Sequence, residues 1–352
     1  MPVDVIIGGQ GGDEGKGKIA EYLGLKRDYK IAMRVPSPQA GHSIMMNGQR
    51  VGLANLPTSV KNEDIRLLIG IGGLVSLERL LYGEVSAQGK ESPAEITATG
   101  IGPGRLGIDY ETRVVSQSNR DSEQANAHLM GKIGSIGSGT SGCRMDTIMR
   151  VPLLRAKDYE DLNPYLTNTK EEIYAVLEKG GNIVLEGDHG AKLDPIHSGE
   201  YPYVTTRNVN AASFISDSGI APNQVRDVYV ILKPYTTRVA DGPLEGEVLD
   251  NPKVYDWALN TGGESGSVSG RERRIGAFEW ENVADVIKMN GATKLAISHM
   301  DAPDFVWNSI GYKNEAQFLD DVQGKLCNNW PYPKIELLSY GPGLDEVVEY
   351  SK

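Results

Sequence analysis

The chain has 352 residues, of which 39% are hydrophobic, and its formal net charge is −11 at pH 7. A chain of this size can bury a large core, and its negative charge argues against broad binding to nucleic acids or anionic membranes. Its two cysteines, Cys143 and Cys327, form no Cys-x-x-Cys pair and indicate neither a disulfide framework nor a thiolate metal site. We find no secretory leader and no apolar run long enough to cross a membrane, so we expect a cytoplasmic protein.

A glycine-rich segment near the start of the chain predicts a phosphate site. Residues 3–7 indicate a buried strand, and a helix is expected from near Gly15. The bare N–H groups of the glycines between them, together with the positive end of the helix, can hold an anion with help from Lys16 or Lys18. The alternative is a glycine-rich turn with solvated charges, but six glycines in the first seventeen residues carry an entropic cost that a turn does not need.

The same loop indicates how a metal ion is held. The spacing from Gly12 through Gly17 to Lys18 matches the phosphate-loop motif Gly-x-x-x-x-Gly-Lys, but Ile19 stands where that motif has a metal-binding serine or threonine. Mg²⁺ prefers oxygen ligands and bridges to phosphate, so the carboxylate of Asp13 is the expected substitute.

The rest of the chain predicts an α/β fold. Apolar, β-branched runs indicate strands, and helical patterns lie between several of them. The expected strands are 65–72, 181–187, 225–233, 293–301 and 334–341, and the expected helices include 169–179, 281–290 and 314–326. This alternation favours a large, mainly parallel central sheet covered by helices, with a P-loop-like nucleotide site. No repeat or linker divides the chain, so residues 1–352 are expected to form a single domain.

Five further segments carry polar groups suited to catalysis or binding. They are 36–44 with His42, the hydroxyl-and-glycine loop 131–142, the segments 185–194 and 201–209 with their acidic, histidine and threonine residues, and the arginine-rich loop 266–276. An imidazole in a turn can meet an oxyanion, and closely spaced arginines can clamp carboxylates. Taken singly, three of them have simpler interpretations: a structural or exposed histidine for 36–44, a flexible linker for 131–142 and a solvated basic loop for 266–276.

Six of these segments, taken together, resemble motifs of the adenylosuccinate synthetase family. The family's G-x-Q-W-G-D-E-G-K-G-K appears as GGQGGDEGKGK, N-A-G-H as QAGH, I-G-T-T-G-x-G as IGSIGSG, E-G-A-Q-G as EGDHG, Y-P-Y-V-T-S as YPYVTT and T-G-R-R-R-R as SGRERR. The motifs occur in the family's order over essentially the whole chain, whose length is similar to that of the compact archaeal and phage members.

The resemblance implies a ligase with a two-step reaction. A nucleoside triphosphate phosphorylates the 6-oxygen of a purine nucleotide, and the amine of aspartate then displaces that phosphate. It implies that Asp13 takes the N1 proton and that His42 assists the leaving diphosphate. It also implies Mg²⁺ bound by Asp13 and Gly41, and a homodimer in which Arg150 reaches the nucleotide phosphate of the partner subunit.

The family's binding positions can be carried over one by one. The positions that match the triphosphate site are Gly12, Asp13, Glu14, Gly15, Lys16, Gly17, Gly41, His42, Arg273, His299, Asp301, Gly341 and Pro342. Those assigned to the purine acceptor are Asp13, Gln39, Ser135, Ile136, Arg150, Asp188, His189, Leu193, Thr205 and Arg271. Those that match the aspartate loop are Ser267, Val268, Ser269, Gly270, Arg271 and Arg273.

Several of these positions depart from the family pattern. His189 replaces the glutamine of E-G-A-Q-G beside a new carboxylate, Asp188, and Ile136 replaces a threonine. His299 replaces the lysine of the guanine-binding T-K-x-D stretch, which leaves Asp301 alone and makes an adenine donor plausible. Such changes resemble the phage branch of the family, which acts on dGMP to make 2-aminoadenine precursors.

The sequence therefore favours dGMP, aspartate and ATP or dATP as substrates, in a host cytoplasm if the chain is phage-encoded. A buried, unpaired 2-amino group would cost about 1–3 kcal/mol, and we expect Asp188 or a nearby backbone carbonyl to accept its hydrogen bond. The alternative is an archaeal-type enzyme that uses IMP and GTP. A nucleotide switch or ATPase is more remote, because it would leave the arginine loop and the QAGH turn without a role.

Overall fold

The structure, a computed structural model, describes residues 1–85, 91–239, 241–248, 251–260, 264 and 271–351. Ten of its strands form one sheet in the order β11-β9-β5-β2-β12-β1-β13-β16-β17-β18. These are β1 Val3–Gly8, β2 Tyr29–Arg34, β5 Arg66–Ile69, β9 Leu106–Asp109, β11 Leu166–Thr167, β12 Asn182–Glu186, β13 Val225–Leu232, β16 Lys294–Ile297, β17 Lys334–Ser339 and β18 Val347–Glu349. All neighbours are parallel except β17 and β18.

Helices connect most of these strands. The α-helices are α1 Lys16–Lys26, α2 Glu95–Thr99, α3 Gln117–Ala125, α4 Thr140–Met149, α5 Thr169–Glu178, α6 Ala211–Ser218, α7 Pro252–Asn260, α8 Trp280–Asn290, α9 Asp304–Ser309 and α10 Glu315–Val322. Shorter helical turns are η1 Ser59–Lys61, η2 Glu78–Tyr82, η3 His128–Ile133, η4 Ala156–Asp158, η5 Glu160–Tyr165, η6 Ala191–Leu193, η7 Pro222–Gln224, η8 Gln323–Cys327 and η9 Leu344–Glu346.

The fold class expected from the sequence is confirmed. The five strands predicted by residue range correspond to β5, β12, β13, β16 and β17, and the three predicted helical ranges to α5, α8 and the pair α10 and η8. The apolar runs at these positions are buried on both sides, as strands in the middle of a parallel sheet must be.

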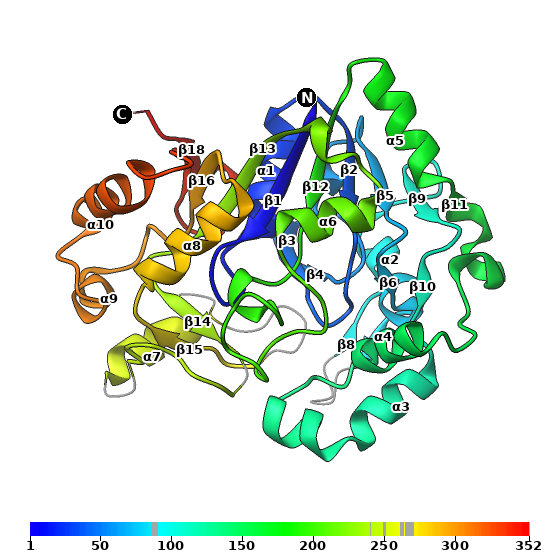
Figure 1. Cartoon of the computed structure of the whole chain (residues 1–352), viewed down its shortest axis with the longest axis horizontal. Helices are drawn as coiled ribbons and strands as arrows, with labels where there is room; N and C mark the ends of the chain where they lie inside the picture. The colour runs from blue at the N-terminus through cyan, green and yellow to red at the C-terminus, as the bar shows by residue number, and fades with distance from the viewer. Residues whose placement is uncertain (86–90, 240, 249–250, 261–263, 265–270, 352) are drawn as a thin grey trace.

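Helices cover both faces of the sheet. Along β1, Val3, Val5 and Ile7 belong to one apolar cluster and Ile6 to another, because successive side chains of a strand point to opposite faces. The first cluster includes residues of α5, α6, α8 and α10, and Figure 1 shows α5 and α6 on the near side of the strands. The second includes Ile19 and Leu23 of α1.

Smaller pieces gather beyond the ends of the sheet strands. The additional strands are β3 His42–Met46, β4 Gln49–Leu53, β6 Leu74–Val75, β7 Glu84–Val85, β8 Glu91–Ser92, β10 Arg113–Val114, β14 Thr236–Arg238 and β15 Arg274–Gly276. In Figure 1, β14, β15, α3 and α4 lie below the sheet, on the side to which β1 runs from the N-terminus. This is the edge at which parallel strands end and where open α/β sheets bind ligands. None of the helices in the described ranges is long and apolar enough to cross a membrane.

Candidate active site

A cavity of about 330 Å³ lies at the carboxyl edge of the sheet. Its walls come from the loops that follow β1, β2, β12, β13 and β16, which include the middle strands of the sheet. The predicted site residues that line it are Gly12, Asp13, Gly15, Lys16, Gly17, Gln39, Gly41, His42, Ile136, His189, Leu193, Thr205, Arg271, Arg273 and His299. The fold therefore brings together segments separated by more than 250 residues of sequence.

The glycine-rich loop after β1 is held in shape by a buried carboxylate. Glu14 Oε1 accepts hydrogen bonds from the backbone N–H groups of Gln10 (3.0 Å) and Gly12 (2.9 Å). Its other oxygen accepts from Lys16 Nζ at 2.6 Å. Glu14 is fully buried and does not line the cavity, so its side chain shapes the loop and orients Lys16.

The start of α1 requires glycine for reasons of space. A Cβ at Gly17 would lie 2.7 Å from the Cβ of His42, and a Cβ at Gly190 would lie 2.2 Å from the carbonyl oxygen of Gln10. Such distances are too short for side-chain atoms. The glycines thus let the loops that follow β2 and β12 pack directly against the phosphate loop.

His42 is oriented by Glu186, the last residue of β12. Its Nδ1 contacts Glu186 Oε1, and the other Glu186 oxygen accepts from the N–H (2.8 Å) and hydroxyl (2.9 Å) of Thr58. The opposite ring nitrogen, Nε2, is buried without a partner among the described residues. Burial, followed by the nearby charge of Arg34, lowers the pKa of His42. The ring is thus held by Glu186, and His42 is among the residues that line the cavity.

Asp13 lies at one end of a series of paired charged side chains, the others of which are buried. Its Oδ1 accepts from Arg273 at 2.6 Å, and the same guanidinium donates to Glu264 at 2.6 Å. Glu264 also accepts from Lys233 Nζ and from the Tyr235 hydroxyl, both at 2.8 Å. Burial alone would raise the pKa of Glu264, but the charges of Lys233 and Arg273 hold it below its usual range.

Three residues assigned to the acceptor nucleotide form one cluster. Gln39 Nε2 donates to Thr205 Oγ1 at 2.5 Å and lies 3.2 Å from His189 Nε2. Thr205 Oγ1 is also 3.2 Å from that nitrogen. His189 has a positive φ of 56°, a conformation that non-glycine residues adopt mainly at functional sites.

The arginine-rich loop contacts the hydroxyl-and-glycine loop. Arg271 donates to the backbone carbonyls of Gly134 (2.6 Å) and Ser135 (3.0 Å). The Ser135 hydroxyl donates to Glu123. Arg271 and Ile136 line the cavity, whereas Ser135 does not.

Six other predicted residues, with Ser135, do not line the cavity. Glu14 and Asp188 are buried behind it, and Arg150, Asp301 and Pro342 are exposed. The Gly341 carbonyl accepts from Lys18 Nζ at 2.5 Å, beside the phosphate loop. The aspartate-loop residues Ser267, Val268, Ser269 and Gly270 lie outside the described residues. Asp188 was assigned to accept a purine 2-amino group, and its position behind the cavity wall gives no support for that role.

The charged side chains of the wall are mainly cationic. They are Lys16, Lys18, Arg50, Arg238, Arg271 and Arg273, against the single carboxylate of Asp13. In a chain with a net charge of −11, such a concentration is suited to phosphorylated and dicarboxylate ligands.

No sequence motif marks Arg50, Arg238, Lys233 or Glu264, and Glu186 stands out only as an acidic residue at the end of a predicted strand. Their significance depends on pairings across distant segments.

The residues fit a magnesium site that is completed by substrate. Asp13 and Gly41 line the same cavity, but no group of three histidine, cysteine or acidic residues suited to a metal occurs in the described part of the chain. Mg²⁺ is commonly bound by one or two carboxylates, several waters and substrate phosphate. One carboxylate beside a phosphate loop meets that requirement.

Comparison with known proteins identifies the family. The family model described as "Adenylosuccinate synthetase" matches residues 5–161 and 154–322. The chain belongs to the adenylosuccinate synthetase family. Its members are C–N ligases that join aspartate to a purine nucleotide. An adenylosuccinate synthetase from Methanococcus vannielii is 34% identical over 99% of both chains, and one from Thermococcus onnurineus is 37% identical over 99% of this chain and 98% of that protein.

Two solved structures share the fold. Fully ligated adenylosuccinate synthetase from Plasmodium falciparum has a TM-score of 0.82 at 20% identity and covers 100% of both chains. Cyanophage S-2L succinoaminodeoxyadenylate synthetase, bound to dGMP and dATP, has a TM-score of 0.71 at 23% identity and covers 100% of this chain and 96% of that chain. At these identities the likeness shows the fold alone. The archaeal relatives support the IMP alternative better than the phage-type interpretation with dGMP and 2-aminoadenine, and they give no support for a phage host.

Proposed function

We propose that the chain is an adenylosuccinate synthetase that joins aspartate to IMP at the expense of a nucleoside triphosphate, with GTP as the donor. The proposal is carried by one observation: Asp13 and His42 lie in a single cavity whose other charged side chains are cationic. Archaeal relatives at 33–37% identity over almost the whole chain support it. The reaction consumes IMP, aspartate and the nucleoside triphosphate. It releases adenylosuccinate, the nucleoside diphosphate and inorganic phosphate.

Asp13 is the proposed general base of the first step. Removal of the N1 proton increases electron density on the 6-oxygen, which then attacks the γ-phosphorus and expels the diphosphate. In the structure Asp13 is paired with Arg273. The Asp13 carboxylate must therefore give up part of its contact with Arg273 when nucleotide binds.

His42 is proposed to assist the departing diphosphate. His42 lines the cavity with its Nε2 unpartnered among the described residues, and Glu186 can stabilise positive charge on the ring when Nε2 carries a proton. Lys16 and the amides of the glycine-rich loop lie on the same side and supply donors to the phosphates. Mg²⁺, when bound by Asp13 and Gly41, would neutralise charge on the triphosphate.

A second candidate is dGMP with an adenine donor, and two departures favour it. Ile136 lines the cavity where the family has a threonine, and His299 lines it where the family has lysine. His299 Nδ1 is 2.7 Å from the Ser298 hydroxyl, and burial lowers the pKa of His299 to about 4, so the ring is neutral near pH 7. A neutral ring can accept from the adenine amino group or stack on the base.

One assay separates the candidates. IMP, dIMP, GMP and dGMP are each paired with GTP, ATP and dATP, and the succinylated products are identified by mass. The main proposal expects adenylosuccinate from IMP and GTP with the highest kcat/KM. A preference for dGMP would establish the second candidate, and phosphate release that does not depend on aspartate would indicate a nucleotide switch or ATPase.

Loss of Arg271 or Arg273 is expected to weaken aspartate binding. Each lost charge-assisted pair with a substrate carboxylate should cost about 1.5–3 kcal/mol, so Arg271→Ala and Arg273→Ala should raise the KM for aspartate by roughly ten- to a hundredfold. The KM for the triphosphate should rise much less. Steady-state kinetics with each substrate varied in turn measures this, and Arg274→Ala, which removes the neighbouring pair with Glu247, is the control. Equal effects on all substrates would mean that the loop is structural.

The donor base is expected to depend on residues 298 and 299. If His299 selects adenine, the pair of changes Ser298→Thr and His299→Lys should shift the ratio of kcat/KM for GTP to that for ATP by about ten- to a hundredfold toward GTP. The measurement is competition between the two triphosphates in wild type and variant. A wild-type protein that already prefers GTP by tenfold or more contradicts the adenine assignment.

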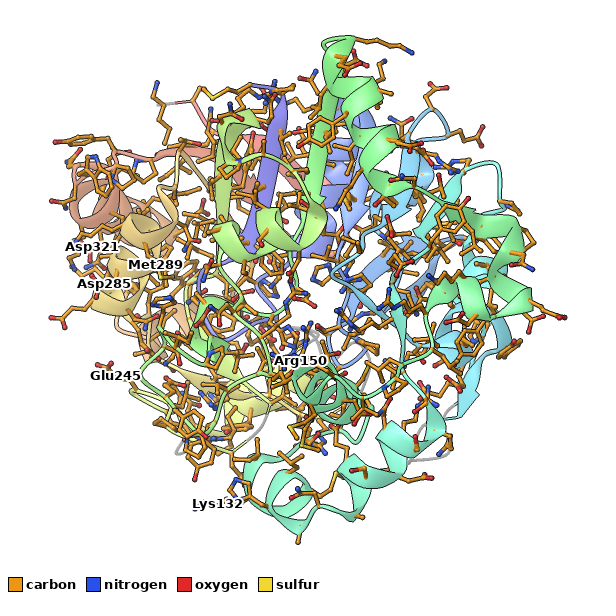
Figure 2. The ribbon with its side chains drawn as sticks, turned by 45° about the vertical axis from the view of Figure 1, so that its right-hand side comes forward. Lys132, Arg150, Glu245, Asp285, Met289 and Asp321 are labelled. Carbon is orange, nitrogen blue, oxygen red and sulfur yellow. The ribbon has the colours of Figure 1, made fainter. Side chains whose placement is uncertain are left out.

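A homodimer is also proposed, formed through α4. Met145, Ile148 and Met149 on this helix are 56–77% exposed, and Val151 and Leu154 continue the apolar surface. Single exposed apolar side chains are normal on a monomer, whereas several that lie close together indicate an interaction surface. Arg150 is exposed at the end of the same helix and is labelled in Figure 2. An interface here would leave Arg150 able to serve a neighbouring active site, as the resemblance implies.

A mixing experiment tests this arrangement. Asp13→Asn and Arg150→Ala should each be inactive alone, because each lacks one part of every site. Mixed dimers hold one intact site, so random reassociation of equal amounts should restore about a quarter of wild-type activity. Absence of recovery, with mixed dimers verified by mass, would show that Arg150 acts within its own subunit or not at all.

A further inference from the structure

A buried charge cluster lies directly behind the acceptor residues and has no assigned role. Asp188 is fully buried, and its Oδ1 is 3.2 Å from Nδ1 of His189. This is an ion-pair contact, because neither carboxylate oxygen nor that Nδ1 has a hydrogen-bond partner among the described residues. The two side chains therefore face each other in a place where water and other partners are excluded.

Two arginines stabilise the negative charge of Asp188. Arg207 Nη1 lies 4.0 Å from Asp188 Oδ1 and donates to the Val35 carbonyl at 2.8 Å, while Arg207 Nη2 donates to Asp217 at 2.5 Å. Arg144 of α4 also interacts electrostatically with Asp188, and its Nε and Nη2 are buried and unpartnered among the described atoms. Burial would raise the pKa of Asp188, but the adjacent His189 and the charge of Arg207 hold it below its usual range.

Two hydrogen-bond donors lie beside Nε2 of His189, the ring nitrogen that does not contact Asp188. Gln39 Nε2 and the Thr205 hydroxyl both lie 3.2 Å from His189 Nε2. Because Gln39 already donates to the Thr205 oxygen at 2.5 Å, the threonine hydrogen is free to point toward the ring. With the Gln39 amide in this orientation both neighbours are donors, and a neutral imidazole meets them by accepting at Nε2, which places its proton on Nδ1.

From these contacts we propose that Asp188 is a positioning residue, which holds the proton of His189 on Nδ1 so that Nε2 accepts from Gln39 and Thr205 and keeps these two acceptor-site side chains in place for the nucleotide. This inference rests on the proposed function, because it concerns the purine-binding side of the same cavity. It also explains why the two departures from the family motif occur together. A glutamine offers both a donor and an acceptor without help, whereas a histidine needs a partner that selects its tautomer.

The protonation of His189 can be measured directly. In protein labelled with ¹⁵N-histidine, long-range ¹H–¹⁵N spectra at pH 8 distinguish the two tautomers, and His189→Gln assigns the signal among the five histidines. We expect the Nδ1–H form in the wild type and a mixture of the two forms in Asp188→Asn. The Nε2–H form, or a doubly protonated ring, in the wild type would overturn the proposal even if Asp188→Asn fails to fold.

Kinetics then test whether the effect passes through His189. Asp188→Asn should raise the KM for the acceptor nucleotide by about tenfold and those for aspartate and the triphosphate by less than about twofold, because one charge-assisted contact is lost. In a His189→Gln background the same change should alter the acceptor KM by less than about twofold. Asp217→Asn is the matched control, since it removes the other carboxylate of Arg207 without touching His189. Equal effects of Asp188→Asn in both backgrounds would mean a structural role.

The two levels of inference fail in different ways. If no purine nucleotide is succinylated by the wild type, the proposed function is wrong, while the tautomer of His189 still stands as a property of the protein. If turnover is normal and insensitive to Asp188→Asn, the proposed function survives and the positioning role is overturned.

Discussion

Asp13→Asn is expected to reduce kcat by about 10²–10⁴-fold, which is the usual contribution of a general base. The amide keeps the shape of the side chain but cannot take the N1 proton, and it is a weaker ligand for Mg²⁺. Nucleotide binding should change much less, because the glycine-rich loop is held by Glu14 and Lys16, which the substitution leaves in place.

Turnover is measured as succinylated product, and binding by calorimetry with each nucleotide. Asp28→Asn is a suitable control, because Asp28 is exposed at the start of β2, at the opposite edge of the sheet. Retention of more than about a tenth of the wild-type rate, a barrier change of only about 1.4 kcal/mol, would argue against the general-base role. A parallel loss of nucleotide binding would indicate that Asp13 acts mainly through the loop.

Glu264→Gln is expected to lower the free energy of unfolding by about 3–5 kcal/mol, because it leaves buried cations without their counter-charge. Glu264 is fully buried and joins Lys233, Tyr235 and Arg273 in one network. The isosteric amide keeps the volume but places an NH2 donor where Glu264 had an acceptor, so the loss reports charge and hydrogen bonding and not packing. Activity should fall as well, since Arg273 would lose one of the two carboxylates that position it.

Urea denaturation measures the change, with Glu247→Gln as the matched control. Glu247 pairs with Arg274 nearer to the surface, and such pairs contribute about 0–1 kcal/mol. The double change Lys233→Met and Glu264→Gln should recover part of the loss, because both members of the pair are then neutral. If Glu264→Gln costs no more than Glu247→Gln, the cluster is better solvated than its burial indicates.

Local pattern was sufficient for the fold class and the main elements. The apolar runs that became β12, β13, β16 and β17 are short, β-branched and separated by helical periodicities, so their assignment needed no long-range information. The same holds for the glycine-rich loop, where glycines follow a strand and precede a helix. The phosphate loop, His42 and the arginine loop could therefore be selected before the structure was known.

Long-range pairings in the site could not be predicted in this way. Glu186 was visible after a predicted strand, but its contact with His42 joins β12 to β3, 144 residues apart in sequence. Glu264 stands beside the loop expected to bind aspartate, and its partner Lys233 directly follows β13. Asp188 was expected to face the purine. It lies behind the wall because its neighbour His189, with a left-handed backbone, turns toward the cavity instead.

The sequence by itself determined that this protein is an α/β enzyme with a phosphate loop, an arginine loop and the motifs of a purine nucleotide–aspartate ligase. These properties can be read from residue type and spacing. Hydrophobic periodicity reflects the backbone geometry of helices and strands, and glycines occur where backbone segments or phosphates approach closely. Only the tertiary structure decided which charges pair. The order of strands β2, β12, β1, β13 and β16 brings their carboxyl ends to one edge, and burial there makes each ionised side chain depend on a partner from another strand.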